Sequence, residues 1–78
     1  MDPRFRDVLA EILEVDGKTL ADDTRREDTE TWDSLTHLRL ITAVESTFHV
    51  QLSMDEIAAA NTPRALEQFV RAHGGLHA

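Results

Sequence analysis

The chain has 78 residues and no cysteine, and its fifteen acidic residues outnumber eight lysines and arginines to give a formal net charge of -7 at pH 7. A chain of this length buries about 60% of its unfolded surface, which argues against a deep enzyme cleft, and without thiols it has no disulfide, thiolate metal site or cysteine nucleophile. The negative charge disfavours nucleic acid and anionic membranes, so we expect a single domain over residues 1–78 that binds proteins with basic surfaces.

The chain begins with a segment that predicts a helix over residues 4–15. MDPRFRD lacks the apolar stretch of a signal peptide, and no run approaches the roughly 18 apolar residues of a membrane span, so we expect a cytoplasmic protein. Asp2 is the expected cap and Pro3 the first helical residue, and Asp16-Gly17 ends the helix. The apolar residues have the i, i+3, i+4, i+7, i+8 spacing of one helical face: Phe5, Val8, Leu9, Ile12 and Leu13.

Residues 16–33 predict a long polar connection. Leu20 and Trp32 are its only sizeable apolar residues, and we expect Trp32 to be a core anchor. Loops of this length are uncommon in compact domains and often functional. From residue 22 to residue 33 acidic residues outnumber Arg25 and Arg26, a pattern typical of a solvated loop; they are Asp22, Asp23, Glu27, Asp28, Glu30 and Asp33.

A second helix is predicted over residues 34–48, with Asp33 or Ser34 as its N-cap. Leu35 falls on its polar side, where it is a candidate contact for a partner. At about 100° per residue, that polar side carries Arg39, Thr42, Ser46 and Thr47. The wide apolar side carries His37, Leu38, Leu40, Ile41, Val44 and Phe48.

The rest of the chain predicts a short extended stretch at Val50 and Leu52 and two more helices. Ser53 with Glu56 is a capping box that opens a short third helix over residues 54–60, and Thr62-Pro63 opens the last. The last helix has a stripe of Leu66, Phe69, Val70 and His73 and ends at Gly74-Gly75. We predict an all-α fold, a small four-helix bundle of three main helices and a short third, with a core over about residues 3–73 and a frayed end at 74–78.

Ser34 admits more than one role. As a cap it satisfies free amides of the helix, whereas as an exposed hydroxyl at a helix N-terminus it suits a phosphate ester. An enzyme interpretation pairs Ser34 with His37 as nucleophile and base, but a third orienting group and an oxyanion site are not evident, so we expect no enzyme. The four histidines have no metal-ligand spacing, so we expect no metal site.

The motif Asp33-Ser34-Leu35 at the start of a helix resembles the acyl carrier protein family. The resemblance covers nearly the whole chain, because the order of helices and the acidic loop also match. Further matching positions follow the motif: Leu40-Ile41, Val44-Glu45, Phe48, Val50, Leu52, Glu56-Ile57 and Thr62. In that family a phosphopantetheinyl transferase moves 4'-phosphopantetheine from coenzyme A onto the serine. The resemblance implies that Ser34 carries this cofactor and that its thiol holds acyl-type groups as thioesters.

The resemblance also implies partners and surfaces. Expected partners are the transferase, an acyl- or aminoacyl-activating ligase, and downstream transferases or synthases of a fatty-acid or polyketide type of pathway, and we expect a monomer. The implied docking residues are Asp33, Leu35, Arg39, Glu45, Asp55 and Glu56. An acyl chain, if sequestered, would lie beneath Leu38, Ile41, Val44, Ile57 and Ala60, which the core also needs.

The sequence departs from fatty-acid carriers on both sides of Ser34. Thr31-Trp32 stand where those carriers usually have glycine and a small residue, and Thr36 and Arg39 replace acidic positions of the second helix. These differences favour a specialised stand-alone carrier with other partners. An aminoacyl or peptidyl carrier, and an unmodified interaction module of the same fold, are the alternatives.

Overall fold

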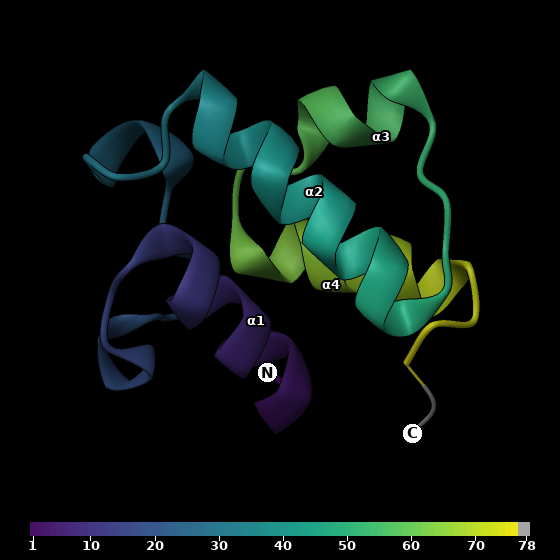
Figure 1. The fold of residues 1–78 in the computed structure, drawn as a ribbon, viewed down its shortest axis with the longest axis horizontal. Helices are drawn as coiled ribbons and strands as arrows, with labels where there is room; N and C mark the ends of the chain where they lie inside the picture. Colours follow the sequence, from purple (N-terminus) through teal and green to yellow (C-terminus); the bar gives the residue numbers. More distant parts are fainter. Residues whose placement is uncertain (77–78) are drawn as a thin grey trace.

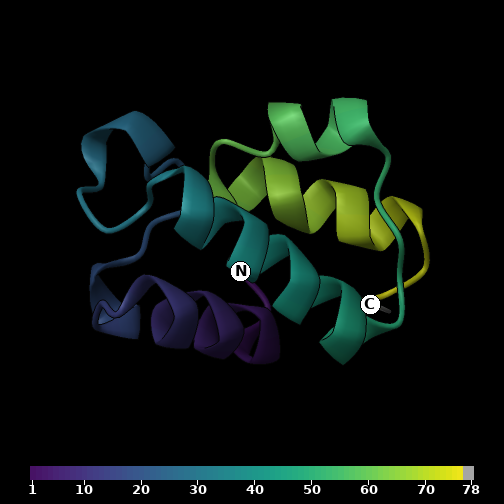
Figure 2. The same ribbon diagram turned by 45° about the horizontal axis from the view of Figure 1, so that its top comes forward.

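The computed structural model describes residues 1–76, and every regular element within them is helical. The predicted all-α fold is therefore confirmed. Figure 2 shows α2 between α1 on one side and α4 on the other, with the short α3 beside α4, and in the view of Figure 1 α2 crosses in front of α4. The elements in chain order are α1 (Pro3–Leu13), the 3-10 turns η1 (Gly17–Thr19) and η2 (Arg26–Asp28), α2 (Ser34–Phe48), α3 (Met54–Ala59) and α4 (Pro63–Ala72). Within residues 1–76 no helix has the length and apolar character to cross a membrane.

The core forms where the apolar faces of α1, α2 and α4 meet. The two apolar residues of the long loop, Leu20 and Trp32, are both buried in it as predicted. Removal of this surface from water supplies the main driving force for the fold. The largest fully buried side chains are Phe5, Leu9, Leu13, Leu40, Val44, Pro63, Leu66 and Val70.

The predicted caps of α1, α3 and α4 are present. Asp2 accepts hydrogen bonds from the first-turn amides of α1, and Thr62 accepts one from the amide of Ala65. Ser53 and Glu56 form the reciprocal capping box of α3. Helix α1 ends at Leu13, two residues before the predicted end, because Glu14 takes a left-handed conformation with a φ of 56°.

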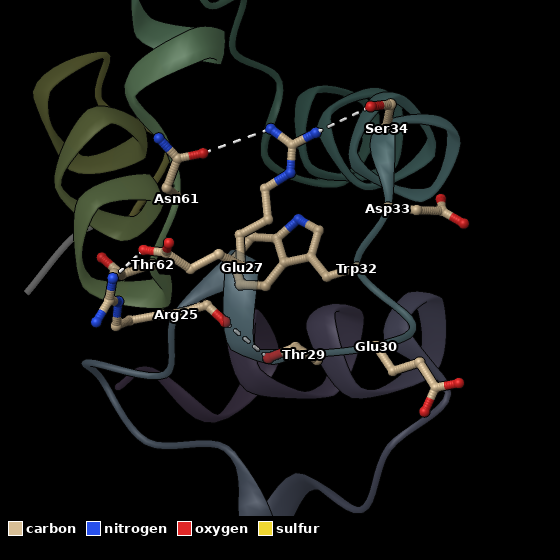
Figure 3. A pocket seen from close by; sticks show the side chains of 10 residues that line it. Arg25, Glu27, Thr29, Glu30, Trp32, Asp33, Ser34, Asn61 and Thr62 are labelled. Atoms are coloured by element: carbon tan, nitrogen blue, oxygen red, sulfur yellow. Dashed lines mark hydrogen bonds and ion pairs between the residues drawn. The ribbon is translucent and has the colours of Figure 1, made fainter.

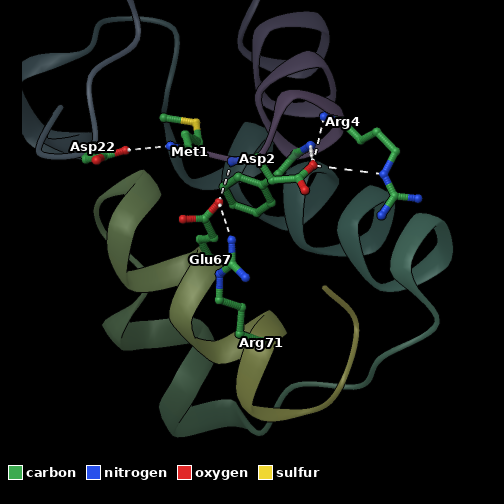
Figure 4. Close-up of polar contacts among 7 residues, drawn as sticks. Met1, Asp2, Arg4, Asp22, Glu67 and Arg71 are labelled. Carbon is green, nitrogen blue, oxygen red and sulfur yellow. Dashed lines mark hydrogen bonds and ion pairs between the residues drawn. The ribbon is translucent and has the colours of Figure 1, made fainter. Parts of the chain in front are cut away.

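The N-terminal end of α1 is tied to α4 and to the long loop (Figure 4). The backbone amide of Asp2 donates to Glu67 Oε2 over 2.7 Å, and Arg71 pairs with the same carboxylate oxygen at 3.7 Å. The amino group of Met1 lies 3.7 Å from Asp22 Oδ1 in the long loop. These contacts join α1, α4 and the loop.

The long loop is more ordered than a plain polar connection because it contains η1 and η2. Two backbone hydrogen bonds fasten it to the second half of the chain. The amide of Arg26 donates to the carbonyl of Asn61, and the amide of Arg64 donates to the carbonyl of Asp22, each over 2.9 Å. The loop segment before α2 is thereby held against the connection between α3 and α4.

The prediction of a frayed end is wrong for residues 74–76, and residues 77–78 lie outside the described residues. The amide of Gly75 donates to the carbonyl of Val70 over 2.9 Å, and Leu76 is only 4% exposed. Burial of Leu76 offsets the cost of ordering this segment. The core therefore extends to residue 76, beyond the predicted limit of 73.

Gly75→Ala is expected to lower the free energy of unfolding by about 1–3 kcal/mol, the usual cost of overpacking. A Cβ at this position would lie 2.7 Å from Cγ1 of Val50 and of Val70. Urea unfolding followed by the fluorescence of Trp32 measures the loss. Gly17→Ala is the control, because its Cβ would meet side-chain atoms at 3.6 Å or more. Equal stability of both variants would show that residues 74–76 are not packed against the core.

Candidate functional site

The first turn of α2 assigns the two predicted capping candidates different roles. Asp33 is the N-cap, and its Oδ1 accepts a hydrogen bond from the amide of Thr36 over 2.8 Å. This hydrogen bond lowers the pKa of the Asp33 carboxyl. Ser34 is the first residue of the helix and is exposed. Its hydroxyl is thus not needed to cap the helix.

The Ser34 hydroxyl faces one cation from the loop (Figure 3). Arg26 Nη2 donates to Ser34 Oγ over 3.5 Å, and Nη1 of the same guanidinium donates to Asn61 Oδ1 over 3.4 Å. A contact of 3.5 Å is at the long limit of a hydrogen bond, so it holds the hydroxyl only weakly. Ser34 Oγ remains open to an incoming reagent.

An open cleft of about 680 Å³ lies beside Ser34, between the loop that precedes α2 and the connection before α4. The side chains around it are mostly polar or charged (Figure 3). A polar, open cleft of this kind suits a polar group that remains partly in water. Its lining residues are Arg25, Arg26, Glu27, Thr29, Glu30, Trp32, Asp33, Ser34, Asn61 and Thr62.

Trp32 and His37 form a buried polar pair beneath the cleft. Trp32 is 2% exposed and His37 is 3% exposed. Trp32 Nε1 donates to His37 Nδ1 over 3.0 Å, and His37 Nε2 lies 2.8 Å from the carbonyl oxygen of Ile57. An indole N–H can only donate and a carbonyl can only accept, so His37 is neutral with its proton on Nε2. Burial lowers the pKa of His37 and favours that neutral form.

This pair fulfils the expectation that His37 is a core histidine with satisfied hydrogen bonds. It joins the loop, α2 and α3 through three residues. Both ring nitrogens are occupied, so His37 has none free to take the proton of Ser34. The arrangement therefore gives no support to a serine–histidine catalytic pair. Within residues 1–76 no group of three potential metal ligands is close enough to hold a metal ion.

The predicted docking residues divide into exposed and structural ones. Asp33, Leu35, Arg39 and Asp55 are exposed, and Leu35 is 61% accessible. Glu45 and Glu56, by contrast, are half-buried and accept hydrogen bonds from backbone amides of the fold, and their part in docking stays a prediction. Helical periodicity predicts which face of a helix carries a carboxylate. It does not predict that a backbone amide from a neighbouring segment will hydrogen-bond to that carboxylate.

Hydrogen bonds show what the two structural carboxylates do. Glu45 Oε2 accepts from the amide of Leu52 over 2.8 Å and fixes the turn after α2. Glu56 Oε1 accepts from the amide of Ser53 and lies 2.9 Å from Nε2 of the His73 ring. The hydrogen bond from the Ser53 amide, and to a lesser extent the one with His73, lower the pKa of Glu56. His73 therefore ends α4 in a polar contact, outside the apolar stripe predicted for it.

The residues predicted to lie over an acyl chain are not all in one place. Ile41, Val44 and Ala60 are buried and Ile57 is half-buried, whereas Leu38 is 59% exposed. Leu38 is at the margin of the apolar side of α2, where it lies against a groove shared with α1. That groove is lined by Ile12, Leu38, Arg39, Thr42, Ala43 and Ser46. The expected position of Leu38 in the interior is thus wrong.

Arg26 and Asn61 are functional candidates that sequence reasoning missed. They are 35 positions apart and meet only because the loop packs against the α3–α4 connection. Arg26 lies in an acidic loop whose charge pattern is typical of a solvated segment, and Asn61 belongs to no motif. No periodicity or motif in the chain signals this contact.

Comparisons with known proteins identify relatives of this fold. A family model described as "Phosphopantetheine attachment site" matches residues 3–70, from α1 into α4. The solution structure of a holo acyl carrier protein from Geobacter metallireducens is similar, with a TM-score of 0.79 and 21% identity over 90% of this chain and 80% of that chain. At this identity the likeness concerns the fold. Comparison with curated proteins gives no significant match.

Proposed function

Because the chain belongs to the family described as the phosphopantetheine attachment site, we propose that it is a carrier protein whose 4'-phosphopantetheine is attached to the Ser34 hydroxyl. Covalent 4'-phosphopantetheine is the cofactor of this family. The observation that carries the proposal is that Ser34 is exposed in the first turn of α2 while Asp33 performs the capping. Ser34 lies within the matched residues 3–70.

The site suits a phosphodiester. The amides at the N-terminus of α2 and the helix dipole favour negative charge there, and the open cleft leaves room for it. In the loading step the Ser34 hydroxyl gives its proton to the transferase, and its oxygen bonds to the phosphorus of coenzyme A that carries pantetheine while the nucleotide half leaves. The cofactor supplies the thiol, absent from the chain itself, that holds an acyl-type group as a thioester.

The carrier works by presenting a tethered intermediate to enzymes and has no catalytic centre of its own. Tethering raises the effective concentration of the intermediate at each partner. The partners are a phosphopantetheinyl transferase, an acyl- or aminoacyl-activating ligase and downstream transferases or synthases. Arg39 on the exposed side of α2 supports partners of a specialised pathway, because it reduces the negative charge that a basic docking surface would contact.

Intact mass after incubation with coenzyme A, magnesium and a broad-specificity phosphopantetheinyl transferase tests the proposal. A gain equal to one phosphopantetheine group is expected. No gain under conditions that load a known carrier would contradict it and would favour an unmodified interaction module of the same fold. Tandem mass spectrometry of the loaded protein then identifies the modified residue.

Leu35→Ser is expected to slow loading about tenfold without changing stability, because an exposed leucine next to Ser34 is a hydrophobic anchor for the transferase. The rate of mass gain at limiting transferase measures the effect. Leu38→Ser is the matched control, since Leu38 is equally exposed but lines the groove toward α1. Equal slowing by both substitutions would contradict a specific role for Leu35.

A further inference from the structure

We propose that Arg26 binds the phosphate of the loaded protein, so that its guanidinium pairs with the phosphodiester on Ser34 and holds the base of the arm at the mouth of the cleft. This inference rests on the proposed loading of Ser34. It assigns a function to a loop residue that neither the capping of α2 nor the hydrophobic core requires. The contacts of Arg26, its charge and the donor geometry of its side chain support it in turn.

The position of Arg26 is set by contacts at both ends of the residue. Its backbone amide donates to the carbonyl of Asn61 over 2.9 Å, which fixes the start of η2. Its Nη1 donates to Asn61 Oδ1 over 3.4 Å, and its Nη2 reaches Ser34 Oγ at 3.5 Å. Figure 3 labels the two partners, Ser34 and Asn61, and marks with a dashed line the hydrogen bond that each makes with Arg26. The side chain thus lies beside the hydroxyl before any modification.

The charge of Arg26 is not neutralised by a neighbour. The preceding Arg25 forms ion pairs with Glu27 and Asp28, whereas Arg26 makes none within residues 1–76. Glu27 is engaged by Arg25, and in Figure 3 the carboxylates of Glu30 and Asp33 point away from the guanidinium. The half-buried cation next to Ser34 therefore lacks an anionic partner.

A phosphodiester on Ser34 would supply that anion. Its unesterified oxygens are attached to the phosphorus that bonds to Ser34 Oγ, so they come within reach of a guanidinium already 3.5 Å from that oxygen. A planar guanidinium offers two parallel N–H donors that match a phosphate group. Loading exchanges one long hydrogen bond to a neutral hydroxyl for charge-assisted bonds. The loop, α2 and Asn61 are then held together more strongly than in the unloaded protein.

A thermodynamic cycle of Ser34 loading and Arg26→Gln tests the inference. Melting temperatures are measured for the unloaded and loaded forms of parent and variant, with loading verified by intact mass. We expect loading to raise the melting temperature of the parent by about 4 °C at low ionic strength. In a domain of this size, such a shift corresponds to roughly 1 kcal/mol of added stability. Most of this rise in melting temperature should be lost in Arg26→Gln. In the parent the rise should be smaller at 1 M salt, where the screening length is about 3 Å.

Arg64→Gln is the matched control because Arg64 is exposed near the cleft but does not line it. It removes the same charge, and its loaded form should keep the full rise. Equal rises in parent and Arg26→Gln would overturn the inference while leaving the proposed function intact. Failure of the parent to load would instead contradict the proposed function. If Arg26→Gln cannot be loaded, the melting temperatures of the parent at low and high salt test the inference. A rise on loading that is absent or independent of salt would overturn it.

Discussion

Replacement of Ser34 by alanine is expected to abolish loading completely while leaving the fold almost unchanged. Loading requires the hydroxyl oxygen as the attachment atom, and alanine has none. The fold does not depend on that oxygen, because Asp33 caps α2 and the contact from Arg26 to Ser34 is long. We expect the free energy of unfolding to change by less than about 0.5 kcal/mol, as for other surface substitutions. The combination of lost loading and retained stability separates attachment from capping.

Intact mass with coenzyme A and the transferase measures loading, and urea unfolding measures stability. Ser46→Ala is the matched control, because Ser46 is an exposed serine on the same helix, and it should load like the parent. An undiminished mass gain in Ser34→Ala would disprove the attachment site. A large loss of stability would show instead that Ser34, and not Asp33 alone, supports the helix start.

His37→Ala is expected to lower the free energy of unfolding by about 3 kcal/mol. It leaves the buried N–H of Trp32 and the carbonyl of Ile57 without partners, each at a cost of about 1–3 kcal/mol, and opens a cavity. A domain of this length has a total free energy of unfolding of about 4–12 kcal/mol. The variant should therefore populate its unfolded state at much lower urea concentrations than the parent does. The midpoint of the fluorescence transition of Trp32 measures the change.

His37→Gln is the matched variant for the same site. Its amide oxygen can accept from Trp32 and its amide nitrogen can donate to Ile57, so it should recover part of the lost stability. Equal losses in the alanine and glutamine variants would mean that volume, and not hydrogen bonding, sets the cost. No loss in either would contradict the buried Trp32–His37 pair.

The pH dependence of this pair has a defined sign. Burial lowers the pKa of His37 in the folded protein below the value of about 6.5 of an unfolded chain. Above pH 6.5 both states are neutral and the full stability is present. Below it the unfolded chain takes up a proton that folded His37 resists, so stability falls until the pH reaches the folded pKa. The advantage of the parent over His37→Gln should therefore shrink between about pH 7 and 5, and a constant advantage would contradict the assignment.

Local sequence signals determined the helices and the position of Ser34. Each cap satisfies amides within its own first turn, and each apolar stripe repeats with the period of the helix, so both can be recognised without knowledge of the fold. Helix α2 begins and ends at the predicted residues 34 and 48. Burial of Leu20 and Trp32 also followed from composition alone, because they were the only large apolar groups in a polar loop.

Only the tertiary structure decided which polar groups are free and which are bound. The sequence does not show that Glu45 accepts a hydrogen bond from the amide of Leu52, or that Leu76 is buried in the core. The contact between Arg26 and Asn61 joins residues 35 positions apart. Such contacts depend on how separate elements pack, and neither helical periodicity nor a capping motif encodes them. The sequence by itself therefore predicted the serine to which we propose the cofactor is attached, and the packing of the loop determined that the charge of Arg26 lies beside it.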